Sequence, residues 1–131
     1  MDKIIEVLSE RKKAPNRLSK SSKLFKNIIN AIQEKKGEDI ISLDLKKIDE
    51  AVADYFIVCD AKSNIQVHAI ANYIAELVEK ECGEKPFHIE YGDKWTLVDF
   101  VNIVVHVFLH EQRIFYNLEG LWEDALKTDF K

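Results

Sequence analysis

Apolar residues recur along the chain with two different spacings, and the first of these predicts a helix over about residues 22–36. Within this stretch apolar side chains stand three, four and seven positions apart, which places them on one helical face. They are Phe25, Ile28, Ile29 and Ile32. Ser22 is a candidate N-terminal cap, and Gly37 is a candidate for a left-handed C-terminal cap.

The same spacing predicts a second helix, which begins after Ser63 or Asn64 and runs to about Cys82. Gly83 follows as a stop signal, and Pro86 shortly after it favours the same boundary. The side chains that should face the sheet form one stripe. They are Val67, Ile70, Ala71, Ile74, Leu77 and Val78.

Short apolar or alternating runs between the helices predict five strands. They cover residues 40–45, 54–60, 87–91, 95–100 and 103–109. A last helix is expected over about 111–117 and a terminal turn around 118–124. The order α-β-β-α-β-β-β-α predicts an α/β fold in which helices flank a mixed five-stranded sheet. We expect one domain over residues 21–127, preceded by a flexible basic extension over residues 1–20.

The last three strands are predicted to form two hairpins with two-residue turns at 92–93 and 101–102. The first turn would pair Tyr91 with Lys94, whereas β-branched Val101 is disfavoured at the positive φ that the second turn needs. Alternation along the strands then assigns two faces. The face that the helices should cover holds Phe87, Ile89, Tyr91, Val98, Phe100, Ile103, Val105 and Val107. The other holds His88, Glu90, Trp95, Leu97, Asp99, Val104, His106 and Phe108.

The second face mixes large apolar groups with charged ones, which is typical of a protein-binding patch. Our hypothesis makes Trp95 an exposed anchor. The candidate partner-binding residues are Glu90, Trp95, Leu97, Asp99 and His106. The alternative is that the C-terminal segment folds over this face and buries Trp95, because Trp is usually well buried. His106 alone is more often a packed strand residue than a functional one.

Charge is divided unevenly along the chain. The 131 residues carry a net charge of −4, yet residues 11–26 contain seven basic side chains and no acidic one. The rest is therefore acidic and should be repelled by bare phosphate, so we expect no dedicated nucleic-acid site. No apolar run is long enough to span a bilayer, no signal-peptide pattern is present, and the two cysteines fit a reducing cytoplasm.

Residues for catalysis are not arranged in any recognisable pattern. Asp99 and His106 lie diagonally across the predicted hairpin, but no Ser or Cys has an obvious place beside them as a nucleophile. The turn at residues 60–64 lacks the glycines of a phosphate loop, and no cysteine or histidine spacing fits a metal site. We therefore expect no enzyme activity, no catalytic residue, no cofactor and no metal.

Several stretches together resemble the ribosomal silencing factor family, also called the Iojap family. Two of them are ADYFIVCDAKSNIQVHAIA at residues 53–71 and WTLVDFVNIVVHVFLHEQRIFYNLEGLW at residues 95–122. The third is the expected helix over about 22–36 followed by Gly37 and by IISLDL at residues 40–45. The likeness covers roughly residues 22–124. The chain departs from the family where Val101-Asn102 replaces a frequent Gly-Asp and where Ala61-Lys62 replaces a frequent Gly-Thr.

The resemblance implies a fold like that of nucleotidyltransferases but without their catalytic residues. It also implies binding to ribosomal protein fourteen of the large subunit, with Trp95 at the contact, and steric blocking of subunit joining under nutrient limitation. Some members also accompany late maturation of the large subunit. Two alternative functions stay open. The chain could be a nucleotide-handling enzyme, or a homodimeric structural module that pairs through the face that holds Trp95.

Overall fold

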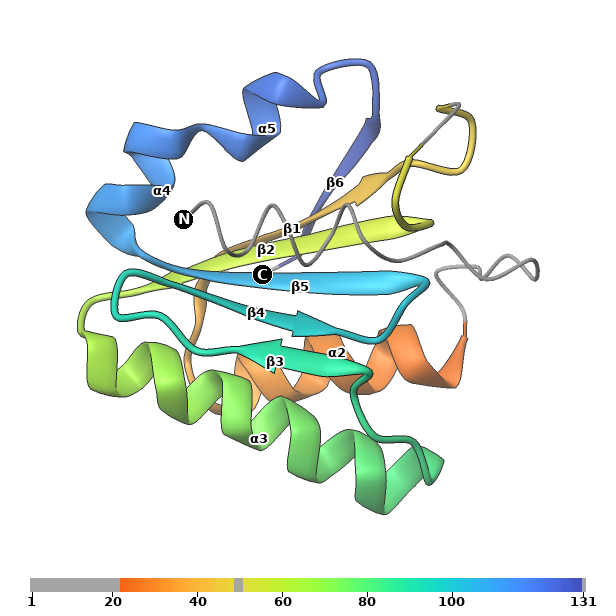
Figure 1. Cartoon of the computed structure of the whole chain (residues 1–131), viewed down its shortest axis with the longest axis vertical. Helices are drawn as coiled ribbons and strands as arrows, with labels where there is room; N and C mark the ends of the chain where they lie inside the picture. The colour runs from red at the N-terminus through yellow and green to blue at the C-terminus, as the bar shows by residue number, and fades with distance from the viewer. Residues whose placement is uncertain (1–21, 49–50, 131) are drawn as a thin grey trace.

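The computed structural model describes residues 22–48 and 51–130 as alternating helices and strands (Figure 1). The expected extension over residues 1–20 lies outside these described residues. In chain order the elements are α2 (Lys23–Glu34), β1 (Glu38–Asp44), β2 (Tyr55–Ala61), α3 (Asn64–Cys82), β3 (His88–Glu90), β4 (Trp95–Asp99), β5 (Ile103–Leu109), α4 (His110–Tyr116), α5 (Leu118–Leu121) and β6 (Leu126–Phe130).

The strands form one mixed six-stranded sheet in the order β3-β4-β5-β2-β1-β6. The central pair β2–β5 is parallel and every other neighbouring pair is antiparallel. The prediction of five strands is wrong because β6 adds to the open edge of β1, with Asp44 opposite Leu126 and Ile40 opposite Phe130. As an edge strand β6 buries little, so its sequence LKTDF lacks the apolar run of a central strand. The expected domain end at residue 127 falls inside β6.

Helices cover the two faces of the sheet unequally. The long helices α2 and α3 lie side by side under one face (Figure 1) and share its large apolar core. The short helices α4 and α5 lie on the opposite side (Figure 1), where Leu45, Ala51 and Ala53 complete a smaller core. The central strands β2 and β5 are buried on both faces, as their continuous apolar runs predict.

Side-chain caps fix the start of both long helices as predicted. The Ser22 hydroxyl accepts a hydrogen bond from the Phe25 backbone N–H at 3.1 Å, and the Ser63 hydroxyl accepts one from Gln66 at 3.2 Å. Gly83 ends α3 with φ at 68°, so the predicted left-handed cap is confirmed there.

The end of α2 differs from the prediction, because Gly37 does not take the left-handed conformation. Lys36 takes it, with φ at 63°, and its N–H donates to the Gln33 carbonyl. The Gly37 N–H closes the cap on the Ile32 carbonyl at 2.9 Å. A Cβ at Gly37 would lie 2.4 Å from the Ile32 Cγ2 atom, so the glycine is needed for close approach.

The predicted division of β4 and β5 into two faces is confirmed, although the β3–β4 register differs. Glu90 lies opposite Leu97, so the strands are displaced by two residues from the predicted Tyr91–Lys94 pairing. A shift of two residues leaves every side chain on its original face. On the second face, β4 and β5 contribute Trp95, Leu97, Val104 and Phe108 to the smaller core.

Candidate partner-binding face and charged cleft

The candidate partner-binding residues lie together on β3, β4 and β5, but four of the five are buried. Trp95 is 4% exposed, and Leu97, Asp99 and His106 are 0% exposed. Only Glu90 is partly exposed. The hypothesis of an outward-facing Trp95 anchor is therefore wrong for the described structure, and the alternative of a covered Trp95 is correct.

Trp95 is held by contacts with three neighbouring aromatic rings, those of His106, Phe108 and Tyr116. Its Nε1–H donates to His106 Nδ1 at 3.1 Å, and the ring stacks on Phe108 with centroids 4.7 Å apart. Tyr116, from the end of α4, lies over it at 5.2 Å. Because His106 Nδ1 accepts this bond, we assign the hydrogen of the neutral imidazole to Nε2. The C-terminal segment thus buries a ring whose single polar group is satisfied.

The aromatic cluster continues from Trp95 toward the end of α5. Phe56 on β2 packs edge-on against His106 at 4.5 Å and against Trp122 at 5.7 Å. Tyr116 and Trp122 are both partly exposed. The cluster therefore has a buried centre on the sheet and two aromatic side chains at its solvent boundary.

Asp99 stabilises the tight turn between β4 and β5 rather than forming an exposed acidic site. Its Oδ1 accepts a hydrogen bond from the Val101 N–H at 2.7 Å. Val101 has φ at 74°, and the Asn102 N–H donates to the Phe100 carbonyl at 3.0 Å, which together describe a γ-turn. A β-branched residue is strained in this conformation, so the carboxylate fixes a turn that its sequence disfavours.

A cleft of about 770 Å³ opens on the other side of α4, between this helix and the β1–β6 edge of the sheet. Asp60, near the end of β2, is 1% exposed and lies next to the start of α4. Its carboxylate accepts a hydrogen bond from Arg113 Nη1 at 2.9 Å and contacts His110 Nδ1 at 3.2 Å. Arg113 also donates to Glu119 Oε1 at 3.0 Å and to the Asp39 carbonyl at 2.6 Å.

Arg113 remains charged in this environment. Burial would lower the pKa of its guanidinium, but the hydrogen bonds and negative charges of Glu119 and Asp60 outweigh burial and raise that pKa above its usual value. The buried Asp60 is thereby paired, as buried charges must be. Arg113 joins β2, β1 and α5, so it fixes α4 against the sheet.

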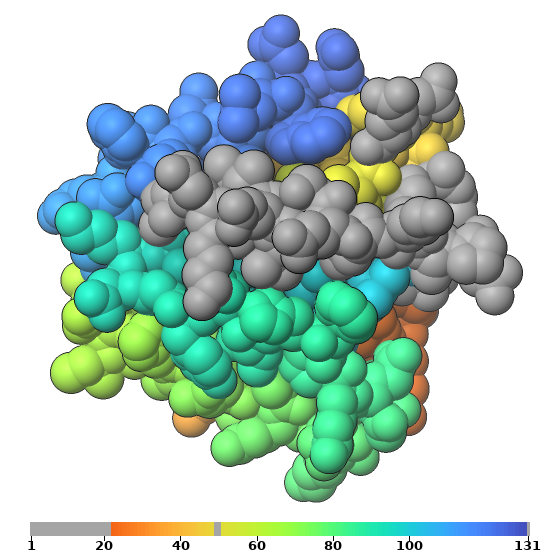
Figure 2. Space-filling model, in the orientation of Figure 1, coloured from red at the N-terminus to blue at the C-terminus, as the bar shows by residue number. Residues whose placement is uncertain are grey.

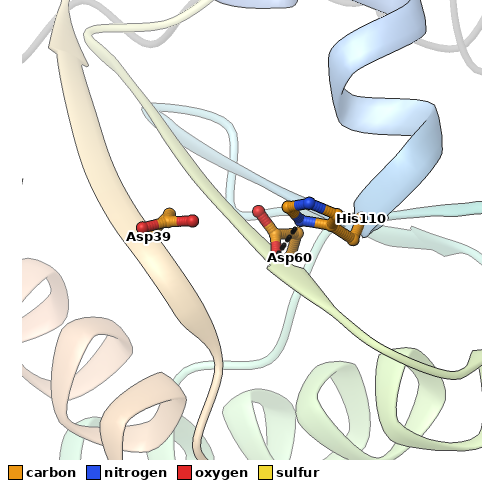
Figure 3. Close-up of side chains that lie close together, drawn as sticks. All are labelled: Asp39, Asp60 and His110. Atoms are coloured by element: carbon orange, nitrogen blue, oxygen red, sulfur yellow. Dashed lines mark hydrogen bonds and ion pairs between the residues drawn. The ribbon is translucent and has the colours of Figure 1, made fainter.

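Among residues 22–48 and 51–130, a metal ion could be held by Asp39, Asp60 and His110. One ligand atom from each lies within 4.8 Å of the others. Figure 3 shows that the three side chains converge from β1, β2 and the start of α4. Two carboxylates and an imidazole suit a divalent transition metal, but Arg113 already neutralises Asp60.

This cluster is not among the sites expected from the sequence, although the sequence contains one signal of it. Asp60 and His110 stand at the ends of two buried apolar runs, and those runs form neighbouring parallel strands with Asp60 opposite Phe108. Parallel neighbours bring their carboxyl ends to the same sheet edge. The sequence does not predict that Arg113 and Asp39 lie beside Asp60, because that depends on how α4 and β1 pack against β2.

No helix among residues 22–48 and 51–130 has the length and apolar character required to span a membrane.

Known proteins match this chain over most of its length. The family described as "Ribosomal silencing factor during starvation" matches residues 18–131. The ribosomal silencing factor of Bacillus subtilis is 44% identical over 101 residues, which are 76% of this chain and 84% of that relative. The corresponding protein of Halalkalibacterium halodurans is 36% identical over 80% of this chain and 90% of its own length. The chloroplastic Iojap protein of Zea mays is 34% identical over 76% of this chain and 43% of its own length.

Solved structures agree with the sequence comparisons. A Chromobacterium violaceum protein has a TM-score of 0.71 at 37% identity, covering 76% of this chain and 83% of that one. A Bacillus halodurans protein has a TM-score of 0.68 at 34% identity, covering 82% and 97% respectively. The predicted family is confirmed: this chain belongs to the ribosomal silencing factors.

Proposed function

We propose that this protein binds the large ribosomal subunit through ribosomal protein fourteen and so prevents the subunits from joining. The observation that carries the proposal is the family match over residues 18–131. A bound protein of 15.2 kDa at the intersubunit surface excludes the small subunit by its volume alone. The result would be repression of translation in the cytoplasm when nutrients are short, with a further part in large-subunit maturation.

The contact surface that we propose is the boundary of the Trp95 cluster. Glu90, Tyr116 and Trp122 are partly exposed there. In Figure 2 the surface of α4 and α5 (blue) and that of the β3–β4 hairpin (green to cyan) are both in view. Aromatic side chains beside a charged rim are typical of binding hot spots.

The buried candidate partner-binding residues would affect this surface indirectly, by supporting the side chains that form it. Trp95 supports Tyr116, and His106 holds the Trp95 indole. Leu97 fills the same core, while Asp99 fixes the turn at the far end of β4. Their replacement would disturb the surface by changing its shape, which separates them from residues that touch the partner.

The mechanism that we propose is steric and needs no reaction. The fold would be that of nucleotidyltransferases used as a rigid scaffold, without their chemistry. An acidic protein that approaches a basic ribosomal protein is steered by opposite charge, so association should slow as salt rises. The same aromatic boundary would pair two copies when the ribosome is absent.

Binding to purified ribosomal protein fourteen, measured by biolayer interferometry, tests the contact surface. Glu90→Lys should slow association, because it reverses a charge at the boundary. Glu79→Lys is the matched control, since Glu79 is an exposed acid on α3 at the opposite face. Tyr116→Ala should accelerate dissociation at least tenfold if it is a hot spot, which corresponds to about 1.4 kcal/mol. Unchanged kinetics for both Glu90→Lys and Tyr116→Ala in folded proteins would contradict this surface.

A further inference from the structure

The outer side of α4 exposes large apolar side chains that the sheet does not use. Ile114 is 69% exposed and Phe115 is 75% exposed, whereas Arg113 before them is 8% exposed. Leu121 on α5 is 75% exposed. Figure 1 shows that the two short helices follow one another on the face opposite α2 and α3. Large apolar groups on consecutive elements are a feature of protein-binding surfaces.

The charged cleft continues this apolar surface. Ile114 forms part of its wall, and Ile40 and Phe130 add further apolar lining. Asp39 and Asp129 are exposed carboxylates of the same cleft. The cleft thus offers apolar contact and negative charge together, and exposed Phe115 follows Ile114 in α4 outside the cleft lining.

The charge of this region selects the chemistry of a partner. Arg113 in the cleft lining is paired with Asp60 and Glu119, and the other charged side chains of the lining are Asp39, Asp129 and Lys127, which together are acidic by one charge. The exposed charged side chains between residues 110 and 125 are all acidic. They are Glu111, Glu123 and Asp124. Such a surface repels phosphate and attracts lysine and arginine.

We propose that the cleft and the apolar side of α4 bind a basic protein segment that carries a large apolar side chain. The apolar side chain packs on Ile114 and Phe115, and neighbouring lysine or arginine side chains reach Asp39 and Asp129. Ile114 lines the cleft, whereas the Phe115 ring contacts Tyr116 edge-on with centroids 5.1 Å apart, so this site adjoins the proposed contact with ribosomal protein fourteen. The proposal does not rest on that contact, because the cleft carboxylates Asp39 and Asp129 are not part of it.

A second copy of this chain fits the surface less well than a basic segment does. Two copies that pair through the same patch around a twofold axis would bring Glu111, Glu123 and Asp124 of each copy against the like-charged partner. Like charges facing one another across an interface oppose association. The complementary occupant is therefore basic.

Fluorescence anisotropy with a labelled twelve-residue peptide of arginine, lysine and leucine tests the proposal on the full chain. The double variant Asp39→Asn/Asp129→Asn should weaken binding up to about tenfold at low salt, because it removes two exposed charge contacts. Glu79→Gln/Glu84→Gln removes the same charge from exposed positions at and after the end of α3 and should change affinity less than twofold.

Apolar contact is tested separately with Phe115→Ser, which should weaken the peptide about tenfold, and with Ile65→Ser as its control. Ile65 is 80% exposed on α3, so the control removes equal apolar character elsewhere. Equal effects of site and control variants would overturn the proposal, as would absence of peptide binding at low salt. A dimer in sedimentation velocity that Phe115→Ser dissociates would also overturn it, because a second copy would then be the occupant.

Discussion

Replacing Trp95 by alanine should destabilise the fold before it affects any partner. The side chain is 4% exposed and stacks on Phe108, so its removal leaves a large cavity in the smaller core. Truncation of a buried tryptophan costs about 3–5 kcal/mol. The lost hydrogen bond to His106 adds about 1 kcal/mol. This is a large part of the roughly 5–15 kcal/mol that holds a typical domain together.

Urea unfolding followed by circular dichroism measures this loss, and a thermal melt should show a fall of roughly 10–20 °C. Trp122→Ala is the control, because Trp122 is partly exposed and should cost only about 1–2 kcal/mol. A Trp95→Ala protein that melts within ~2 °C of the wild type yet loses its ribosomal partner would refute the buried role. That result would restore the exposed anchor.

Three further predictions concern the backbone and the thiols. Val101→Gly should raise the free energy of unfolding by about 1 kcal/mol in urea titrations, because glycine accepts the φ of 74° without steric strain; a destabilised variant would contradict this explanation. Gly37→Ala should lower that free energy by about 1–3 kcal/mol in the same assay, since its Cβ would meet Ile32; wild-type stability would show that the helix end adjusts freely. At pH 8 a thiol reagent should modify partly exposed Cys82 quickly and buried Cys59 only when the protein unfolds. The thiolate is the reactive form, and burial raises the pKa of the Cys59 thiol to about 12, so little of it is ionised at pH 8. Equal modification rates for the two cysteines would contradict this.

The sequence predicted those parts of the fold in which local signals and burial agree. Ser22, Ser63 and Gly83 cap their helices as expected, because capping depends on a few neighbouring residues. The faces of β4 and β5 were also predicted, since alternation survives an error of two residues in the β3–β4 register. Family membership followed from several motifs that occur together in order.

The features that the sequence did not predict depend on packing between distant segments. β6 was missed because an edge strand needs no apolar pattern and forms only where β1 offers a free edge. Trp95 was placed on the correct face, but alternation cannot reveal that Tyr116 covers that face. The ion pair between Asp60 and Arg113 joins residues 53 positions apart, and no local pattern reports such a contact.

A sucrose gradient with purified ribosomal subunits tests the central claim most directly. Small and large subunits would be mixed under joining conditions with and without this protein, and its position would be followed by immunoblot. We expect the protein in the large-subunit fraction and a fall in the joined-ribosome peak that scales with the amount added. Joined ribosomes at an undiminished level, with the protein remaining at the top of the gradient, would contradict the proposed function.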